Sequence, residues 1–191
     1  GDDADGALYR AHLRREGVED RWVATLGGVA TGAAFICVDE QGENQILVDP
    51  GANGRLGIES VEEALTALLP RTDVLLVGLE CSLAVAVTAL RRAAQAGVRA
   101  VFNPSPVVAG FPWRDVPIEA VVVNEHECAE VFGVPEPAAA ARRGVRHLIV
   151  TQGAAPTLWV AADGVQSVPT QAVQPRDTVG DRKSTRLNSS H

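Results

Sequence analysis

Two spacings of apolar residues alternate along this 191-residue chain, and their alternation predicts its fold class. Short apolar runs such as DVLLVGL at 73–79 are typical of strands that are buried on both faces of a sheet. Between such runs lie amphipathic segments with apolar residues every three or four positions, and several end at a glycine, as at Gly97 and Gly133. Strands that alternate with helices in this way predict an α/β fold with a parallel sheet.

The same periodicities place the individual elements. Helices are expected over residues 5–16, 59–69, 83–96, 125–132 and 138–143. Strands are expected over residues 73–79, 98–102, 119–123 and 146–150. Two hairpins complete the set, one over 31–49 that turns at 40–43 and one over 156–169 that turns at Asp163-Gly164.

Composition excludes several classes of function. The formal net charge of −7 argues against a surface for nucleic acid or for anionic membranes. No apolar run approaches the ~20 residues that a membrane-spanning helix needs. The three cysteines, Cys37, Cys81 and Cys128, are widely spaced, so no disulfide or zinc framework is expected and a reducing compartment, the cytoplasm, is favoured. Composition alone also allows a flavodoxin-like binding domain, although such a domain does not need the hairpin over 31–49.

The last eleven residues, DRKSTRLNSSH at 181–191, differ in composition from everything before them. Lys183 is the only lysine of the chain, and the segment holds three serines against four in the preceding 180 residues. We expect this segment to be a foreign tail that matches a translated sequencing adapter, and we leave it out of the fold prediction. Because the chain contains no methionine, we also expect it to be an internal fragment.

Polar residues stand at the carboxyl ends of four predicted strands, where ligands bind in parallel sheets. These residues are Glu80, Asn103, Asn124 and Thr151. Asn124 and the glutamate three residues later also fit a helix-capping box, a geometry that is compatible with ligand binding. Taken alone, Glu80 is typical of a solvated strand end, and Thr151-Gln152-Gly153 is typical of a strand-to-turn transition.

Six short motifs carry a resemblance to a known family. They are TGAAFICVDEQGEN at 31–44, PGAN at 50–53, FNPSP at 102–106, NEHE at 124–127, TQG at 151–153 and DTVG at 177–180. Over residues 1–180, their order and spacing resemble the ribokinase, or PfkB-type, family of sugar kinases. The resemblance implies a doubly wound, three-layer α/β sandwich with a small β-lid. It divides the chain into a core helix segment (1–21), lid strands (22–50), a truncated sugar- and nucleotide-binding core (51–180) and the foreign tail (181–191).

The resemblance also implies roles for seven residues. Glu80 would accept hydrogen bonds from a sugar hydroxyl. The residues that would contact the nucleotide are Asn124, Thr151 and Gly153, although Pro156 stands where the family commonly has a further glycine. Glu127 would hold Mg²⁺ through water. Asp177 and Thr178 would lie in a loop that binds a monovalent cation such as K⁺, but taken alone they are typical of an Asx turn.

By resemblance, the complete protein would transfer phosphate from ATP to a sugar hydroxyl, with D-ribose as the expected substrate. The family continues its D-T-x-G motif as D-T-x-G-A-G-D, whose last aspartate is the catalytic base. Here the match stops at Gly180, so the base is expected downstream and the 191-residue chain is expected to be inactive. The resemblance also implies that the lid covers the sugar and forms the contact of a homodimer. The alternative is that the hairpin over 31–49 simply extends the edge of the main sheet. The alternatives for function are another sugar or a nucleoside as substrate, or a sugar- or nucleotide-binding module without catalysis.

Overall fold

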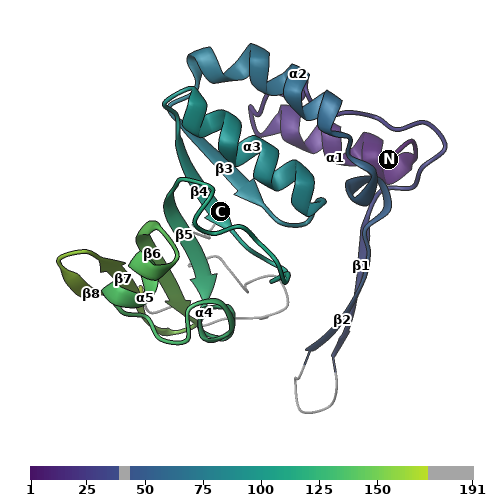
Figure 1. Ribbon diagram of the computed structural model, residues 1–191. Helices are drawn as coiled ribbons and strands as arrows, with labels where there is room; N and C mark the ends of the chain where they lie inside the picture. The colour runs from purple at the N-terminus through teal and green to yellow at the C-terminus, as the bar shows by residue number, and fades with distance from the viewer. Residues whose placement is uncertain (39–43, 172–191) are drawn as a thin grey trace.

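The computed structural model describes residues 1–38 and 44–171, which contain a six-stranded sheet and a separate hairpin (Figure 1). The six-stranded sheet has its strands in chain order: β3 (Val74–Gly78), β4 (Arg99–Asn103), β5 (Ile118–Asn124), β6 (Val145–Gln152), β7 (Ala155–Ala161) and β8 (Gly164–Val168). Neighbours from β3 to β6 are parallel, and β7 and β8 add an antiparallel hairpin. The predicted parallel sheet and second hairpin are therefore confirmed.

The helices next to this sheet share one of its faces. They are α2 (Ile58–Leu68), α3 (Leu83–Gln95), α4 (Glu125–Val131) and α5 (Pro137–Arg142). Helix α3 packs on β3 and β4, α4 packs on β5 and β6, and α2 lies on α3 (Figure 1). Because every parallel connection steps in the same direction along the sheet, right-handed crossovers bring their helices to one face. Helix α1 (Ala4–Arg15) lies near α2 at the end of the molecule that carries the hairpin.

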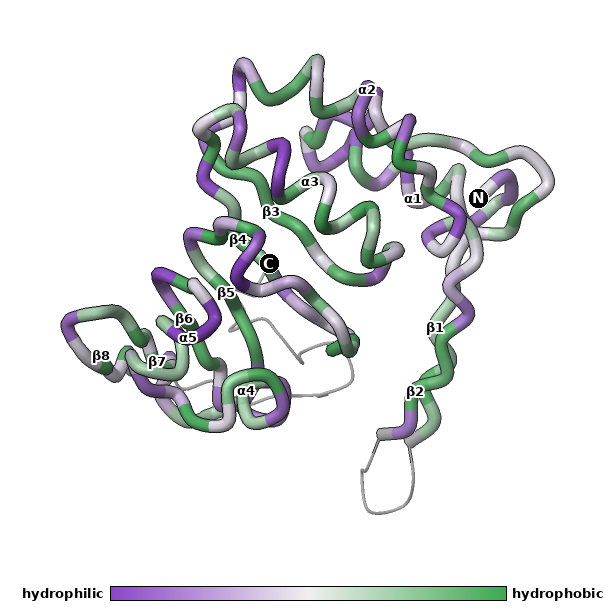
Figure 2. Tube along the Cα trace, viewed as in Figure 1, coloured by the Kyte–Doolittle hydropathy of each residue, from purple (hydrophilic) through white to green (hydrophobic). Residues whose placement is uncertain are grey.

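Burial alternates along the strands in agreement with this arrangement. Phe102, Val121, Leu148 and Val160 form one row across β4 to β7, and all four are completely buried under the helices. On the opposite face, exposure varies along the row that crosses the strands, from Leu76 with 72% of its surface exposed to the buried Ala120. The strands are coloured as apolar in Figure 2 because apolar residues occupy both the covered face and the open face of the sheet. The α/β fold is confirmed, and among the described residues helices cover one face of the sheet.

The loop between β4 and β5 closes the core with aromatic rings. Phe102 stacks on Phe111 at 4.7 Å between ring centroids, and Trp113 lies 4.6 Å from Phe111. Phe132, the residue after α4, meets the edge of Trp113 at 5.4 Å. This cluster holds the β4–β5 loop, α4 and the middle of the sheet together, and thereby fixes the carboxyl ends of β4 and β5.

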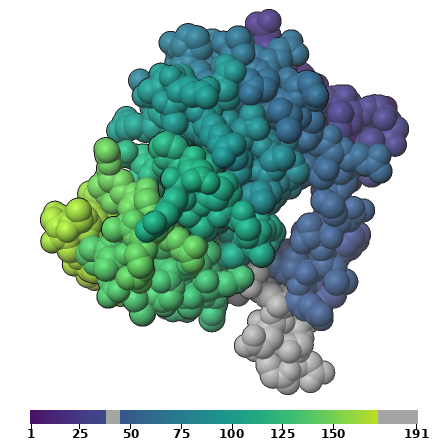
Figure 3. Space-filling view, viewed as in Figure 1, coloured from purple at the N-terminus to yellow at the C-terminus, as the bar shows by residue number. Residues whose placement is uncertain are grey.

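Strands β1 (Ala33–Val38) and β2 (Asn44–Asp49) form an antiparallel ribbon that projects from the body (Figures 1 and 3). Phe35 pairs with Leu47 on one face of the ribbon, and Ile36 pairs with Ile46 on the other. Both faces expose apolar side chains, with 61% of Phe35 and 68% of Val48 accessible. The ribbon does not extend the main sheet, so that alternative is wrong.

The short 3-10 helix η1 (Gly51–Arg55) follows the ribbon, and η2 (Leu69–Arg71) follows α2. Neither was predicted. The other elements have bounds within one or two residues of those predicted from the sequence. In the described part of the chain, no helix combines the length and the apolar character that crossing a membrane requires.

Candidate functional site

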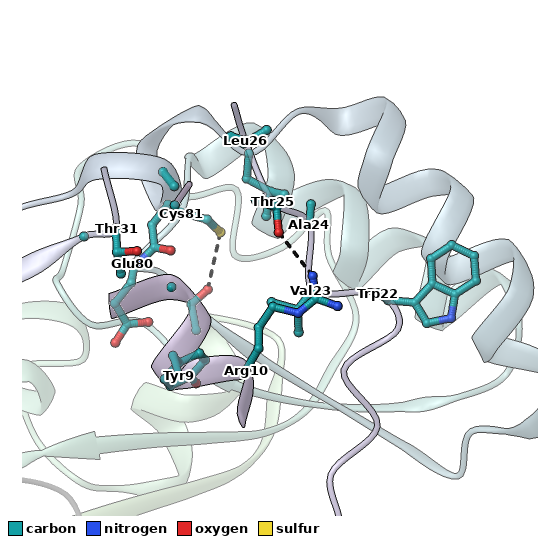
Figure 4. A pocket seen from close by; sticks show the side chains of 17 residues that line it. Tyr9, Arg10, Trp22, Val23, Ala24, Thr25, Leu26, Thr31, Glu80 and Cys81 are labelled. Atoms are coloured by element: carbon teal, nitrogen blue, oxygen red, sulfur yellow. Dashed lines mark hydrogen bonds between the residues drawn. The ribbon is translucent and has the colours of Figure 1, made fainter. Parts of the chain in front are cut away.

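A cavity of about 580 Å³ lies between the root of the β1–β2 ribbon, helix α1 and the carboxyl end of β3 (Figure 4). Four segments that are distant in sequence line it. Their polar members are Tyr9, Arg10, Trp22, Thr25, Thr31, Asn53, Glu80 and Cys81. In Figure 4, Glu80, Thr31 and Cys81 lie toward one end of this cavity, and Arg10, Thr25 and Trp22 lie toward the other. A concave site with few polar groups is the expected form of a small-molecule pocket.

Glu80 is the predicted sugar-contacting residue, and the structure places it in this cavity. The strand before it anchors its position, because Leu79 is buried in the core while Glu80 is exposed. Gly78 makes room for the carboxylate, since a Cβ at position 78 would collide with Oε2 of Glu80. An exposed carboxylate with no competing salt bridge in the described residues is a strong acceptor for hydroxyl groups.

Cys81, the next residue, has a different character. Burial raises the pKa of its thiol, and its Sγ lies 3.9 Å from the carbonyl oxygen of Gly78. The thiol is therefore protonated at neutral pH and is a poor nucleophile. The chemistry at this end of the cavity belongs to Glu80.

The ribbon root supplies two polar residues that were not predicted as site residues, Thr31 and Asn53. Asn53 belongs to the PGAN motif and Thr31 begins the TGAAFICVDEQGEN motif, so a signal for both residues was present in the sequence. The Asn53 amide can donate and accept, the Thr31 hydroxyl can accept because its one proton is donated to Asp3, and the Glu80 carboxylate only accepts. Together these three side chains offer a donor and acceptor set that suits a ligand with several hydroxyl groups.

The opposite wall is built from residues whose polar groups bind each other. Nε of Arg10 lies 2.9 Å from Oδ2 of Asp20, and Nη1 of Arg10 lies 3.1 Å from Oγ1 of Thr25. Nη2 of Arg14 approaches the same Asp20 oxygen at 2.8 Å. The Arg14 and Arg10 guanidinium groups lower the pKa of Asp20 to about 2. Arg10 thus holds the loop over residues 20–25 against α1 through these hydrogen bonds. No sequence motif predicted this network.

A second group of predicted residues meets at the carboxyl ends of β5 and β6. Asn124 accepts a hydrogen bond from the backbone N–H of Glu127 at 2.8 Å, and Oε2 of Glu127 accepts one from the N–H of Asn124 at 2.9 Å. This is the predicted capping box at the start of α4. Thr151 pairs with Asn124 in the sheet and donates to the carbonyl of Val123 at 3.3 Å.

Gly153 follows in the turn between β6 and β7, with φ of +59° and open space where a Cβ would stand. The structure therefore brings Asn124, Glu127, Thr151 and Gly153 to one region, as predicted. Glu80 follows β3, two strands from β5 and three from β6. At about 4.8 Å per strand, the two groups of residues are separated by about 10–15 Å along one sheet edge.

The residues at this edge suit a magnesium ion only if phosphate groups of a bound nucleotide help to coordinate it. Among residues 1–38 and 44–171, no three His, Cys, Asp or Glu side chains come together as a metal cage. Mg²⁺ is commonly held by one or two carboxylates, substrate phosphates and water, and the half-buried Glu127 retains acceptor capacity beside its box hydrogen bond. The predicted cation-loop residues Asp177 and Thr178 lie outside the described residues.

Comparison with known proteins matches the model of the pfkB family carbohydrate kinases to residues 1–180. The chain belongs to this family. The match ends at Gly180, immediately before the segment of different composition. The mouse (Mus musculus) ribokinase is 30% identical over 192 residues, which cover 94% of this chain and 59% of that protein. A deoxyribokinase of Salmonella typhi is 28% identical and covers 94% of this chain and 62% of its own length.

A solved structure supports the family assignment at the level of the fold. The ribokinase of Cryptococcus neoformans var. grubii serotype A, in complex with ADP, superposes with a TM-score of 0.74 and 28% identity. The superposition covers 93% of this chain and 63% of that structure. The pfkB-family chain described here thus spans about three fifths of the length of the relatives that it matches.

Proposed function

We propose that the complete protein transfers a phosphate group from ATP to a hydroxyl group of a sugar, with D-ribose as the substrate. The observation that carries the proposal is the position of Glu80, Thr31 and Asn53 in one cavity at the edge where Asn124 and Thr151 end their strands. Membership of the carbohydrate kinase family and the ribokinase relatives support the same activity. The cysteine pattern supports a reducing compartment, the cytoplasm.

Each described residue receives a role from its position. Glu80 would accept a hydrogen bond from a sugar hydroxyl and orient the ring. Asn124, Thr151 and the open backbone at Gly153 would contact ATP. Glu127 would hold a magnesium-bound water, and Mg²⁺ supplies positive charge that balances the phosphate oxygens when it is bound. Asp177 and Thr178 would face K⁺, as the family resemblance implies.

The 191-residue chain itself is proposed to bind ligands without transferring phosphate. After Asp177, Thr178 and Gly180 the sequence continues as D-R-K, where the family has A-G-D with its catalytic base. Asp181 stands two positions too early to take that role. Phosphorylation of D-ribose by the purified chain would therefore contradict this part of the proposal.

The β1–β2 ribbon is proposed to cover the sugar with one face and a second copy of the protein with the other. Both faces expose apolar side chains that such contacts would bury. Sedimentation of the wild type and of a Phe35→Ser variant tests the dimer, because the variant removes a large exposed ring from one face. Equal masses for both proteins, whether monomeric or dimeric, would argue against a dimer through that face.

The activity is tested by phosphate transfer from ATP in the complete gene product, with D-ribose, 2-deoxy-D-ribose, D-fructose and a nucleoside as acceptors. We expect the highest kcat/KM for D-ribose and a large loss in Glu80→Gln. Preference for another acceptor would reassign the substrate within the family. Ligand binding without any transfer would favour the second candidate, a binding module.

A further inference from the structure

The carboxylate of Asp3 joins two parts of the molecule that are far apart in sequence. Its Oδ1 accepts from the N–H of Gly6 at 2.8 Å, which caps the start of helix α1. The same carboxylate accepts from Thr31 twice, from the backbone N–H at 2.7 Å and from Oγ1 at 2.6 Å. Thr31 is the second residue before strand β1. One side chain therefore fixes both the start of α1 and the start of the ribbon.

At the ribbon root, the backbone just before β1 and the backbone just after β2 lie in close contact. The N–H of Ala52 donates to the carbonyl of Ala30 at 2.9 Å. A Cβ on Gly32 would lie 2.7 Å from the carbonyl oxygen of Pro50, and a Cβ on Gly51 would lie 2.6 Å from that of Ala30. Because the backbones leave no room for side chains at this crossing, the root can move only as one unit.

This unit is part of the cavity wall. Thr31, Gly32 and Asn53 line the cavity that holds Glu80, whereas the outer part of the ribbon is exposed on both faces. The hydrogen bonds to Asp3 are the side-chain hydrogen bonds that tie Thr31 to helix α1 in the described part of the chain. Any displacement of Thr31 against α1 must stretch them.

We infer that Asp3 is a positioning residue, which holds the ribbon root against helix α1 and thereby sets the part of the sugar-cavity wall that Thr31 forms beside Glu80. Asp3 touches no substrate in this arrangement and acts through Thr31. The inference rests on the proposed function for the identity of the ligand, but the hold on Thr31 exists without a ligand.

The substitution Asp3→Asn separates the two tasks of the side chain. Asparagine caps a helix as well as aspartate does, so its oxygen can still accept from Gly6. Its amide nitrogen then faces the N–H of Thr31, and two donors cannot bond each other. Asp3→Ala removes both tasks. Asp5→Asn is the matched control, because Asp5 lies in the first turn of the same helix and loses the same charge.

Amide hydrogen exchange of the full 191-residue chain, resolved by ¹⁵N NMR, tests the hold directly. In Asp3→Asn we expect exchange at Thr31 to become about tenfold faster, the factor that one hydrogen bond provides, with Ala52 following and Gly6 unchanged. In Asp3→Ala all three amides should accelerate, and in Asp5→Asn none should. An unchanged rate at Thr31 in Asp3→Ala would overturn the inference.

Binding of D-ribose, measured by titration calorimetry on the same variants, tests the effect on the cavity. We expect Asp3→Asn to weaken binding about tenfold relative to Asp5→Asn. Faster exchange at Thr31 with unchanged affinity would show that Asp3 does not position the cavity, and would overturn the inference. If the wild-type chain binds none of the four acceptor compounds, the proposal that the 191-residue chain binds a sugar fails instead. In that case, faster amide exchange at Ala52 in Asp3→Asn would still support the positioning role, and an unchanged exchange rate at Ala52 would contradict it.

Discussion

The substitution Glu127→Gln tests whether this carboxylate does more than cap helix α4. In the structure, the Glu127 carboxylate accepts a hydrogen bond from the N–H of Asn124 at 2.9 Å. A glutamine oxygen can accept the same hydrogen bond, so the capping box survives the substitution. What is lost is one negative charge in the first turn of a helix, where a charge contributes about 0.3–1 kcal/mol to stability.

Glu125→Gln is the matched control, because Glu125 is the other acidic residue of the first turn and lies on its exposed side. The two variants should therefore lose similar free energy of unfolding in urea, within about 0.5 kcal/mol of each other. Magnesium with ATP should separate them. A ligand at one hundred times its Kd stabilises a protein by about 2.7 kcal/mol, and a tenfold weaker Kd removes about 1.4 kcal/mol of this.

We thus expect Glu127→Gln, and not Glu125→Gln, to lose about half of the stabilisation by Mg·ATP. The assay is urea unfolding of the 191-residue chain followed by circular dichroism, with and without the ligand. Equal loss of the stabilisation by Mg·ATP in both variants would show that Glu127 acts only as a helix cap. A wild type that gains no stability from Mg·ATP would show that this edge does not hold a nucleotide in the chain.

Four further substitutions test the fold and its surfaces. Phe102→Ala removes a completely buried ring of the aromatic cluster and should cost about 3–5 kcal/mol in urea unfolding, and an unchanged midpoint would refute the cluster as core. Gly51→Ala should cost at least about 1–2 kcal/mol in thermal unfolding, because φ is +47° and backbone blocks the new Cβ, whereas Gly27→Ala, which has open space, should be nearly neutral. The pKa of Asp20 is lowered from 3.8 to about 2 by its arginine partners, so the stability that it contributes is complete above pH 3.8 and is lost as the pH falls through 2. An Asp20→Asn variant should show a weaker dependence of its Tm on pH in that window, and identical profiles would contradict the network. Leu76→Gln on the open sheet face should change stability by less than about 0.5 kcal/mol and reduce self-association in analytical ultracentrifugation, which a larger loss or an unchanged mass would contradict.

Most of the fold follows from hydrophobic periodicity, because burial on one helix face or on both strand faces leaves a repeating pattern in the sequence. The buried run at 73–79 predicts β3, and the Asp163-Gly164 turn predicts the hairpin of β7 and β8. The 3-10 segments η1 and η2 are too short to show a period, which is why they were missed. The parallel order of β3 to β6 follows from the alternation of strands and helices.

The candidate site was predicted where residues stand at strand ends or in the short motifs that the family resemblance rests on. Glu80, Asn124 and Thr151 belong to the first of these groups, because parallel strands carry their carboxyl ends to one edge. Arg10 and Thr31 do not, since they reach the cavity through contacts made 10 to 28 residues away along the chain. No local pattern encodes such contacts. Only the folded chain shows that Asp20 organises the wall opposite Glu80 and that Asp3 holds Thr31 at the end of the cavity that contains Glu80.

The order of strands in the sheet has a consequence for how the two halves of the site can work together. Because β3 to β6 lie in chain order, the distance between Glu80 and Thr151 is set by the strands between them. Those strands are tied by ladder hydrogen bonds and by fully buried side chains such as Phe102 and Val121. The nucleotide edge and Glu80 are therefore parts of one rigid body, and a change of shape on ligand binding must come from the ribbon side of the cavity. That side is held by the Thr31 contacts to Asp3, so adjustment of the cavity depends on a few hydrogen bonds and not on the core.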